Sequence, residues 1–308
     1  MPAIVTLTMN PALDIATETE IIVPSTKLRC EEPRYDPGGG GINVARAVHM
    51  LGGDTLAVFP SGGTSGQMIQ ALLGHEHVPQ IAVTVAGRTR ESLAVVERQS
   101  GKQYRFLLPG PPLAVHDQER VFAALAAHAG GADFLVASGS LPPGVADDFY
   151  ARVGALARRC DARFALDSSG AALTGAGTGV FLIKSSLREL GQLRGAPITG
   201  DAAEEAARAV IAEGRCEVLV VSLGADGALL ATAEGCRRFS PVEVEAQSTI
   251  GAGDSMLAGI LVSLVRDWPL LDAVRFGMAS GAAALLRPGT ELCRREDTER
   301  LYRQLGTA

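Results

Sequence analysis

The sequence predicts an α/β fold in which helices cover both faces of a mostly parallel β-sheet, with a second, smaller sheet inserted into it. Three observations predict this fold. Short apolar runs alternate along the chain with helical patterns, which is typical of repeating β–α units. Several of these runs are apolar throughout, as in strands that are buried on both faces. Two partly polar segments, residues 15–36 and 86–108, interrupt the alternation.

The apolar runs mark the strands expected in the main sheet, at residues 3–9, 55–62, 134–140, 163–169, 180–186 and 217–224. Helical patterns lie between them, at residues 41–53, 65–76, 118–131 and 203–214. The stretch VVSLGADGALL (220–230) predicts a strand, a glycine turn and a second strand. The two interrupting segments alternate polar and apolar residues, and ERQSGKQY (97–104) is a hairpin candidate within the second one. We therefore expect one domain over residues 1–308.

Composition and charge exclude several classes of protein. The chain has 308 residues, 47% of them hydrophobic, which is ample for a buried core. A net charge of −6 argues against a nucleic-acid partner. The five cysteines are scattered without a Cys-x-x-Cys pair, so neither a disulfide framework nor a zinc site is expected. The sequence lacks a signal-peptide pattern and a run long enough to span a membrane, so we expect a cytoplasmic protein.

The stretch IGAGDSMLAGILVSLV (250–265) is the strongest candidate for chemistry. Gly251, Ala252 and Gly253 come just before a predicted apolar helix, where converging backbone N–H groups and the helix dipole favour an anion. Asp254 is placed to take a proton from a hydroxyl that attacks a phosphate. The alternative is that Asp254 or Ser255 merely caps the helix. The small residues and the apolar helix behind them favour the site.

The stretch YDPGGGGINVARAV (35–48) carries four glycines into a predicted helix. It is not a dinucleotide-binding fingerprint, because no apolar strand precedes it, and no Gly-Lys-Ser/Thr occurs that would indicate a P-loop. Glycines such as Gly38 and Gly39 permit a close approach of backbone to a ligand, and Asn43 offers both a donor and an acceptor. The alternative is a flexible loop with a capping asparagine.

Polar residues follow other predicted strands, at the edge where ligands bind to open parallel sheets. Asp14 ends TMNPALD and could accept hydrogen bonds from sugar hydroxyls, or form an Asx-turn. Lys184, one of only three lysines in the chain, could hold a polyphosphate. Ser186 and Glu189 form a capping-box pattern, with Glu189 near a magnesium ion as the alternative. The remaining candidates are two glycines that would let a nucleotide lie close, Gly224 and Gly227, and four cations for a substrate phosphate, Lys27, Arg29, Arg90 and Arg105.

The motifs PGGGGINVARA and STIGAGDSM together resemble the two signatures of the ribokinase-like (PfkB) carbohydrate kinases, and the resemblance runs from TLTMNPALD to RPGTELC. The stretches KLRCEEPRYDPGGGG, YRFLLPG, SGSLPPGV and LDSSG are most similar to the minor-type bacterial 6-phosphofructokinase branch. This resemblance implies a ribokinase-like sheet with a lid formed by residues 15–36 and 86–108. It also implies transfer of the ATP γ-phosphate to the 1-hydroxyl of fructose 6-phosphate, with Mg²⁺ bridging the ATP phosphates.

The resemblance assigns roles residue by residue. Asp254 becomes the base, and the amides of Gly251, Ala252 and Gly253 become the anion hole. The remaining residues divide between the sugar (Asp14, Gly38, Gly39, Asn43), its phosphate (Arg90, Arg105, Lys27, and Ser138 or Ser140) and the ATP site (Lys184, Ser186, Ser222, Gly224, Gly227). A monovalent cation such as K⁺ beside the anion hole and a homodimer through the lid strands are also implied.

Two departures from the family pattern leave alternatives open. The family's Asn-x-x-Glu before the nucleotide site reads Ser186-x-x-Glu189 here, and serine lacks the amide. The stretch NPALD is closer to 1-phosphofructokinases and tagatose 6-phosphate kinases, so either activity is an alternative to 6-phosphofructokinase. A non-catalytic sugar- or nucleotide-binding protein on the same fold is the third possibility.

Overall fold

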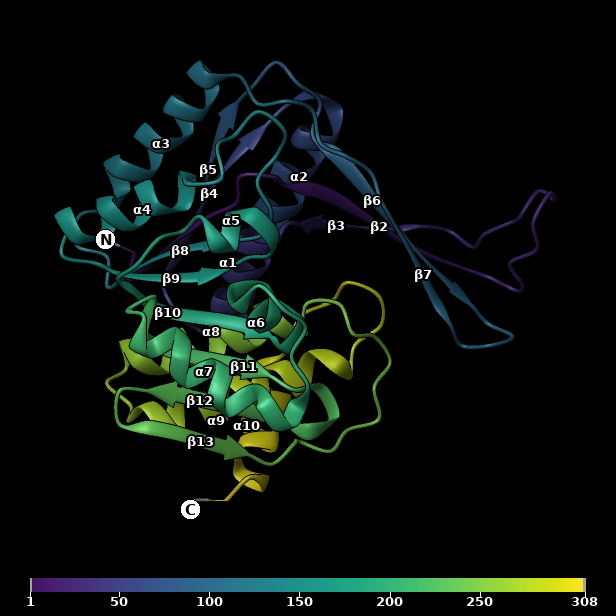
Figure 1. Ribbon diagram of the computed structural model, residues 1–308. Coiled ribbons are helices and arrows are strands. Elements are labelled where there is room, and N and C mark those ends of the chain that lie inside the picture. Colours follow the sequence, from purple (N-terminus) through teal and green to yellow (C-terminus); the bar gives the residue numbers. More distant parts are fainter. Residues whose placement is uncertain (1, 307–308) are drawn as a thin grey trace.

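The computed structural model describes residues 2–306, and its main body is a nine-stranded sheet (Figure 1). The strand order is β13-β12-β11-β10-β9-β8-β1-β4-β5. In this order, all neighbouring strands between β11 and β5 run parallel to each other. Strand β12 is antiparallel to β11, and β13 is antiparallel to β12. The bounds are β1 (Ile4–Leu7), β4 (Thr55–Ser61), β5 (Gln80–Thr84), β8 (Phe134–Ser138), β9 (Arg163–Asp167), β10 (Val180–Ser186), β11 (Cys216–Ser222), β12 (Ala228–Thr232) and β13 (Gly235–Phe239).

The main-sheet strands expected from the apolar runs are confirmed, as is the antiparallel pair around the turn at residues 223–227. The two edge strands, β5 and β13, were not predicted. Both lie half in solvent and carry polar residues, so neither shows the continuous apolar run of a strand buried on both faces.

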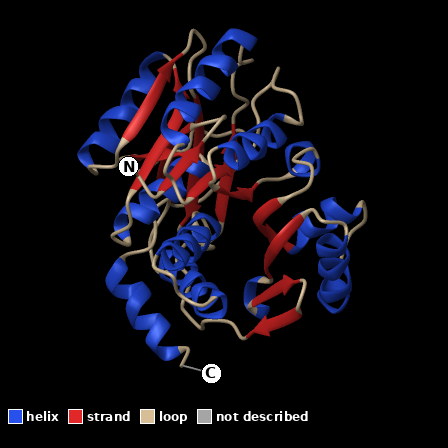
Figure 2. Ribbon diagram, turned by 90° about the vertical axis from the view of Figure 1, so that its left-hand side faces the viewer, coloured by secondary structure: helices blue, strands red, loops and turns tan. Residues whose placement is uncertain are grey.

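Helices form a layer on each face of this sheet (Figure 2). One face is covered by α3 (Val115–Ala129), α4 (Phe149–Arg159), α5 (Gly170–Thr174), α6 (Leu187–Arg194) and α7 (Ala203–Ala212). The other is covered by α1 (Gly40–Met50), α2 (Gly63–His75), α8 (Ala252–Val265), α9 (Leu270–Leu285) and α10 (Arg295–Gln304). None of the helices within residues 2–306 is both long and apolar enough to cross a membrane.

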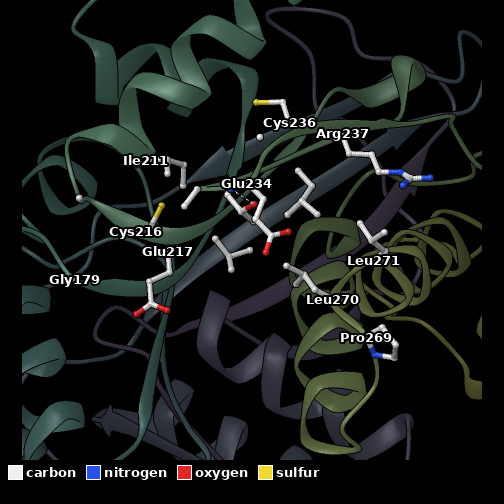
Figure 3. Close-up of a pocket in the computed structure, with 16 residues that line it drawn as sticks. Gly179, Ile211, Cys216, Glu217, Glu234, Cys236, Arg237, Pro269, Leu270 and Leu271 are labelled. Atoms are coloured by element: carbon white, nitrogen blue, oxygen red, sulfur yellow. Dashed lines mark hydrogen bonds between the residues drawn. The ribbon is translucent and has the colours of Figure 1, made fainter.

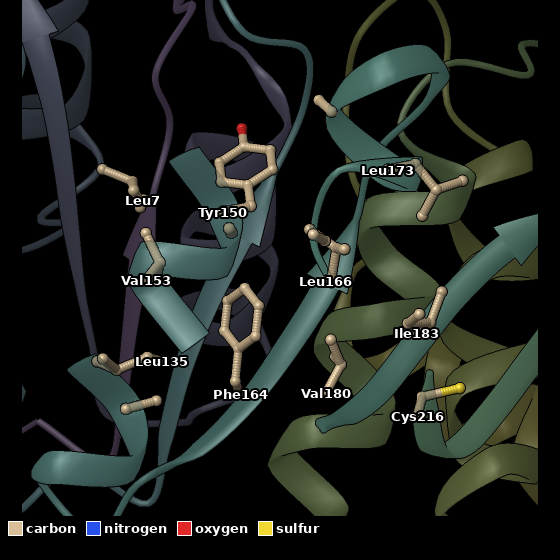
Figure 4. Close-up of a cluster of buried hydrophobic side chains, with 14 of the residues drawn as sticks. Leu7, Leu135, Tyr150, Val153, Phe164, Leu166, Leu173, Val180, Ile183 and Cys216 are labelled. Atoms are coloured by element: carbon tan, nitrogen blue, oxygen red, sulfur yellow. The ribbon is translucent and has the colours of Figure 1, made fainter. Parts of the chain in front are cut away.

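The alternation of side chains along the strands explains why both layers pack well. In β8, Leu135 and Ala137 point to the face with α4, whereas Phe134 and Val136 point to the face with α8. Figure 4 shows the first of these cores, where Tyr150 and Val153 of α4 lie over side chains of β8 and β9. Because apolar side chains and helices cover both faces of the sheet, a ligand can reach polar residues of the strands only at the strand ends.

A second, four-stranded sheet, here called sheet B, projects from the main body (Figure 1). Its order is β3-β2-β6-β7, with bounds β2 (Ala12–Thr19), β3 (Arg34–Gly38), β6 (Arg90–Glu97) and β7 (Gln103–Leu107). The predicted hairpin at residues 97–104 is confirmed by the antiparallel pairing of β6 with β7. The predicted inserted sheet is therefore present, and its strands overlap residues 15–36 and 86–108.

Charged side chains anchor sheet B to the main body. Arg34 on β3 donates from Nε to Asp36 at 2.9 Å and from Nη1 to Glu291 at 2.7 Å, in the loop after α9. Asp36 in turn accepts a hydrogen bond from Thr290 of that loop. Arg46 of α1 is 2% exposed and makes a two-point contact with Glu76 at 2.7 and 2.6 Å. These contacts fix the base of sheet B beside the start of α1.

Candidate active site

The candidate site lies where the carboxyl ends of β8, β9 and β10 meet the N-termini of α1 and α8. A cavity of about 140 Å³ opens there. It is lined by glycine, serine and acidic residues from these different elements, namely Gly40, Ser138, Gly139, Ser140, Asp167, Ser168, Ser169, Glu189 and Asp254. Parallel strands bring their carboxyl ends to one edge, so residues distant in sequence converge at this point.

Asp254 lies in the first turn of α8 and is held by side chains from two other elements. Its Oδ2 accepts a hydrogen bond from Asn43 Nδ2 of α1 at 3.0 Å, and its Oδ1 accepts one from Ser138 Oγ of β8 at 3.4 Å. Burial, together with the nearby Asp167 carboxylate, raises the pKa of Asp254 to about 7, while the Asn43 hydrogen bond and Lys184 act in the opposite direction. The carboxyl group therefore titrates near neutral pH.

The first turn of α8 begins at a glycine with a left-handed backbone. Gly251 has φ of 74°, a conformation that favours glycine, and a Cβ there would come within 2.5 Å of Leu292. Within residues 2–306, no side chain makes a cap hydrogen bond at this terminus, so the capping alternative for Asp254 and Ser255 was wrong. In the part of the chain that the structure describes, the backbone N–H groups of Ala252 and Gly253 donate to no backbone carbonyl one turn earlier, which leaves them available for an anion.

Lys184 lies beneath this first turn. It lies near the carboxyl end of β10, two residues before Ser186, is 6% exposed, and its Nζ donates to Asp167 Oδ2 at 3.0 Å. Its ammonium group also lies against Gly253, where any side chain would collide with it. Burial lowers the pKa of Lys184, but the carboxylates of Asp167 and Asp254 outweigh burial and hold the pKa above its ordinary value. Lys184 therefore remains charged next to the candidate anion site at the start of α8.

Three charged residues lie close together on sheet B. Asp14 lies on β2, Arg90 begins β6 and Arg105 lies on β7. Burial raises the pKa of Asp14 to about 6, although Arg90 and Arg105 both act to lower it. Asp14 on β2 pairs with Asp36 on β3. Its carboxylate fills the space that a Cβ at position 38 would need, so only glycine fits there. Because Asp14 lies within a strand, the Asx-turn alternative was wrong.

Arg90 is held in place by a residue from the end of the first strand. Its Nε donates to Asn10 Oδ1 at 3.1 Å, and its Nη2 donates to the Asn10 carbonyl at 3.2 Å. Asn10 Nδ2 donates to Ser140 Oγ at 3.1 Å. Of the two serines considered from the sequence, Ser140 therefore lies toward the arginine, whereas Ser138 lies toward Asp254.

The residues expected near a nucleotide gather at the ends of β10 and β11. Ser186 and Glu189 form the predicted capping box at the start of α6, with both the backbone N–H and the hydroxyl of Ser186 donating to Glu189 Oε2. Ser222 pairs with Ser186 across the two strands, and its hydroxyl donates to the Ser185 carbonyl at 3.2 Å. The turn that follows, with Gly224 and Gly227, continues this edge.

The structure brings most of the predicted site residues together but leaves Lys27 apart. Lys27 lies in the exposed loop between β2 and β3, at the far end of sheet B (Figure 1). Asn43 lies inside α1, whose N-cap residue is Gly39, so the capping-asparagine alternative was wrong. Two residues were missed from the sequence, Asp167 and Asn10. Asn10 follows the predicted strand at residues 3–9, and Asp167 lies near the end of the one predicted at residues 163–169. A place at the carboxyl end of a strand was the only signal available for them.

A second hollow lies at the opposite end of the main sheet (Figure 3). Its volume is about 820 Å³, and it is lined by Cys216 at the start of β11, by Cys236 of β13 and by Leu270 and Leu271 of α9. Although larger, it lies at the amino ends of the parallel strands. None of the predicted site residues lines it, so the chemistry belongs to the smaller cavity near Asp254.

Comparison with known proteins gives a family and several relatives. The model of the pfkB family carbohydrate kinases matches residues 7–297. A Mycobacterium tuberculosis protein named ATP-dependent 6-phosphofructokinase isozyme 2 is 52% identical over 302 residues, covering 98% of this chain and 89% of that protein. The Escherichia coli protein of the same name is 42% identical over 308 residues, covering 99% of both. A 1-phosphofructokinase from Xanthomonas campestris is 33% identical, covering 85% of this chain and 84% of that protein.

Solved structures of Escherichia coli phosphofructokinase-2 share the whole fold. The complex with potassium superposes with a TM-score of 0.94, and the complex with fructose-6-phosphate with a TM-score of 0.92. A tetrameric inhibited form has a TM-score of 0.93. Each is 40% identical to this chain and covers 100% of both chains. The predicted resemblance and the ribokinase-like fold are therefore confirmed.

We predict that Lys184→Met destabilises the protein by about 3–5 kcal/mol at pH 8, because it leaves two buried carboxylates without their cation. The loss should shrink at pH 5, since Asp254, with a pKa of about 7, then carries a proton and no longer needs the lysine. Urea unfolding at both pH values measures this difference. Lys102→Met, at an exposed lysine, is the matched control and should change stability little. An equal loss at both pH values would contradict the prediction.

Proposed function

This chain belongs to the pfkB family of carbohydrate kinases, and we propose that it transfers the γ-phosphate of ATP to the 1-hydroxyl of fructose 6-phosphate. The product would be fructose 1,6-bisphosphate. The observation that carries the proposal is Asp254, a carboxyl group with a pKa near 7 beside the free amides of the α8 N-terminus. Relatives at 42% and 52% identity over nearly the whole chain carry the name 6-phosphofructokinase, which supports this substrate.

Each half of the reaction has residues suited to it. Asp254 takes the proton from the attacking hydroxyl, and the hydrogen bonds from Asn43 and Ser138 orient its two oxygens. The N–H groups of Ala252 and Gly253 stabilise negative charge on the transferred phosphoryl group, with Lys184 beneath them. The work of this site is mainly positioning and charge stabilisation, as is general for phosphoryl transfer.

The sugar and its phosphate would bind between these groups and sheet B. Asp14 is placed to accept hydrogen bonds from sugar hydroxyls, with Gly38 and Gly39 allowing a close approach. Arg90 and Arg105 supply positive charge for the 6-phosphate, because both lie close enough to Asp14 to act on its carboxylate. Lys27 lies apart from the site in this structure, so its role as a further phosphate ligand rests on the family resemblance alone, as does the role of sheet B as a lid.

The residues present fit Mg²⁺ and ATP. Glu189 uses one oxygen for the Ser186 capping box, which leaves the other available in the cavity that Asp167 also lines. One or two carboxylates together with substrate phosphates are the usual Mg²⁺ environment in kinases. When bound, Mg²⁺ would neutralise charge on the ATP phosphates. Ser186, Ser222, Gly224 and Gly227 would line the nucleotide, and the short side chain of Ser186 is already used within its own helix.

We also propose a potassium ion beside the α8 N-terminus. Two loops meet there, since Gln247 N–H donates to the Leu285 carbonyl and Ser248 Oγ donates to the Gly289 carbonyl. Such loops offer carbonyl oxygens, which are suitable ligands for a hard cation. The Escherichia coli relative has been solved in complex with potassium, which supports this assignment. A cytoplasmic location follows from the proposed use of ATP and a sugar phosphate.

The second candidate function is phosphorylation of fructose 1-phosphate. It is favoured by the 33% identity with a 1-phosphofructokinase and by the stretch NPALD. The two substrates carry phosphate at opposite ends of the sugar, so they need cations at different distances from Asp254. The lower identity ranks this activity behind 6-phosphofructokinase. A non-catalytic binding protein ranks last, because Asp254 is present and both of its oxygens are hydrogen-bonded.

The test of the proposal is ADP release with Mg²⁺-ATP against fructose 6-phosphate, fructose 1-phosphate, tagatose 6-phosphate, fructose and ribose. We predict the highest kcat/KM for fructose 6-phosphate. The phosphate should contribute strongly, because Arg90 and Arg105 would lack the phosphate that they are proposed to bind when plain fructose binds. A preference for fructose 1-phosphate would move the specificity to the second candidate. Turnover of none of the sugars by a protein that still binds ATP would overturn the kinase proposal.

Asp254→Asn should lower kcat by about 10²–10⁴, the usual contribution of a general base, while KM for the sugar changes only a few-fold. In the unsubstituted enzyme only the ionised carboxylate can take the proton. Since the pKa of Asp254 is raised to about 7, kcat/KM should fall as pH drops through about 7. A pH–rate profile between pH 5 and 9 measures this limb. An acid limb near pH 4, or unchanged turnover in the variant, would reject Asp254 as the base.

We further propose a homodimer formed through sheet B. Large apolar side chains are exposed on this sheet and its loops, including Ile21, Leu28, Phe106, Leu107 and Leu108, each at least 41% exposed. Several large apolar side chains exposed on one small sheet are typical of a protein–protein interface. The tetrameric form of the Escherichia coli relative shows that this fold can self-associate.

The double variant Phe106→Asp/Leu107→Asp should be monomeric at micromolar concentrations, because it places a charge on each face of β7. Light scattering coupled to size-exclusion chromatography measures the mass. Val115→Asp, at an equally exposed apolar residue on α3, is the matched control and should remain dimeric. A monomeric unsubstituted protein, or a dimeric double variant, would contradict the proposed interface.

A further inference from the structure

Arg90 is too exposed to be held by packing alone. It begins β6, where the strand leaves the loop at residues 85–89, and its side chain is only partly buried. An arginine side chain has about 2 kcal/mol of rotamer entropy to lose when it is ordered. A guanidinium group that must meet a phosphate at a defined position therefore gains from partners that order it before the ligand arrives.

The partner is Asn10, in the loop after β1. Arg90 Nε lies 3.1 Å from Asn10 Oδ1 and 3.4 Å from the Asn10 carbonyl oxygen, and Nη2 lies 3.2 Å from that same carbonyl. On the other side, Nη1 donates to Ser92 Oγ at 3.3 Å. The guanidinium group has five N–H bonds, and these contacts use three of them. The other two N–H bonds, one on each terminal nitrogen, remain for a ligand.

Asn10 also connects the arginine to the wall of the catalytic cavity. Its Nδ2 donates to Ser140 Oγ at 3.1 Å, and Ser140 lines the cavity together with Asp254. The amide thus uses its acceptor for Arg90 and its donor for Ser140. Only asparagine among residues of this length offers both groups in one plane, because aspartate lacks the donor. Gly110 packs directly against this amide, since a Cβ there would lie 2.6 Å from Asn10 Oδ1.

We propose that Asn10 is a positioning residue for the sugar-phosphate site. It fixes the guanidinium group of Arg90 relative to Ser140, and through Ser140 relative to the cavity in which Asp254 acts. The distance between the bound phosphate and the reacting hydroxyl is thereby set by one side-chain amide. This inference rests on the proposed function, because it takes Arg90 to be a ligand of the substrate phosphate.

Asn10→Ala should raise KM for fructose 6-phosphate about tenfold, which corresponds to about 1.4 kcal/mol. KM for ATP should stay within twofold, because the side chain of Asn10 hydrogen-bonds to Arg90 and Ser140 and, within residues 2–306, to neither Ser186 nor Ser222. Asn10→Asp should raise KM for the sugar phosphate further. Its carboxylate would pair with Arg90 and repel the phosphate, although it keeps the acceptor. Circular dichroism and thermal unfolding of each variant establish that it is folded.

The decisive measurement is a double-mutant cycle with Arg90→Ala. If Asn10 acts through Arg90, Asn10→Ala should have almost no effect on KM for the sugar phosphate once Arg90 is already absent. Additive effects of the two substitutions, or a KM within twofold of the unsubstituted enzyme in Asn10→Ala, would overturn the inference. If Arg90→Ala itself leaves the affinity for the sugar phosphate unchanged, the phosphate assignment in the proposed function fails instead. The two failures are therefore distinguishable.

Discussion

The charge balance beneath the first turn of α8 is the interaction on which the rest of the site depends. One buried ammonium group, that of Lys184, faces the carboxylates of Asp167 and Asp254. These three residues come from β10, β9 and α8, and none could be buried as a charge without the others, because an unpaired buried charge costs several kcal/mol. A single cation cannot fully compensate two carboxylates. Burial and the Asp167 carboxylate raise the pKa of Asp254 to about 7 against the opposing effect of Lys184, and burial also raises the pKa of Asp167. A carboxyl group that titrates near neutral pH has the property that a base at neutral pH requires.

This balance also constrains how the surrounding elements pack. Helix α1 must lie against α8 closely enough for Asn43 to reach Asp254, since that hydrogen bond keeps the pKa from rising further. The start of α1 is in turn fixed by the contact of Arg46 with the Pro37 carbonyl and with Glu76. Sheet B continues directly into this region through β3. The geometry at Asp254 is therefore supported by residues spread over most of the chain, from Asn43 to Leu292.

Much of this architecture could be predicted from the sequence, for identifiable reasons. Strands buried on both faces leave continuous apolar runs, and the capping box of Ser186 and Glu189 follows a local rule, so both were found. Lys184 was marked by the scarcity of lysine. Asp167 and Asn10 were not found, because their importance comes from contacts with residues 17 and 80 positions away. No local pattern distinguishes an aspartate that meets a buried lysine from one that ends an ordinary strand.

The division of the site between two sheets has a consequence for substrate choice. The proposed base and the proposed anion site belong to the main body, where Lys184 and Asp254 are held by buried partners. The groups suited to the sugar phosphate belong to sheet B and its junction, where Arg90 and Arg105 are partly exposed. Cations on sheet B can therefore be moved or replaced without disturbing the charge balance at α8. In this proposal, specificity and chemistry depend on separate sets of contacts, which fits the similarity of this chain both to a protein named 6-phosphofructokinase and to one named 1-phosphofructokinase.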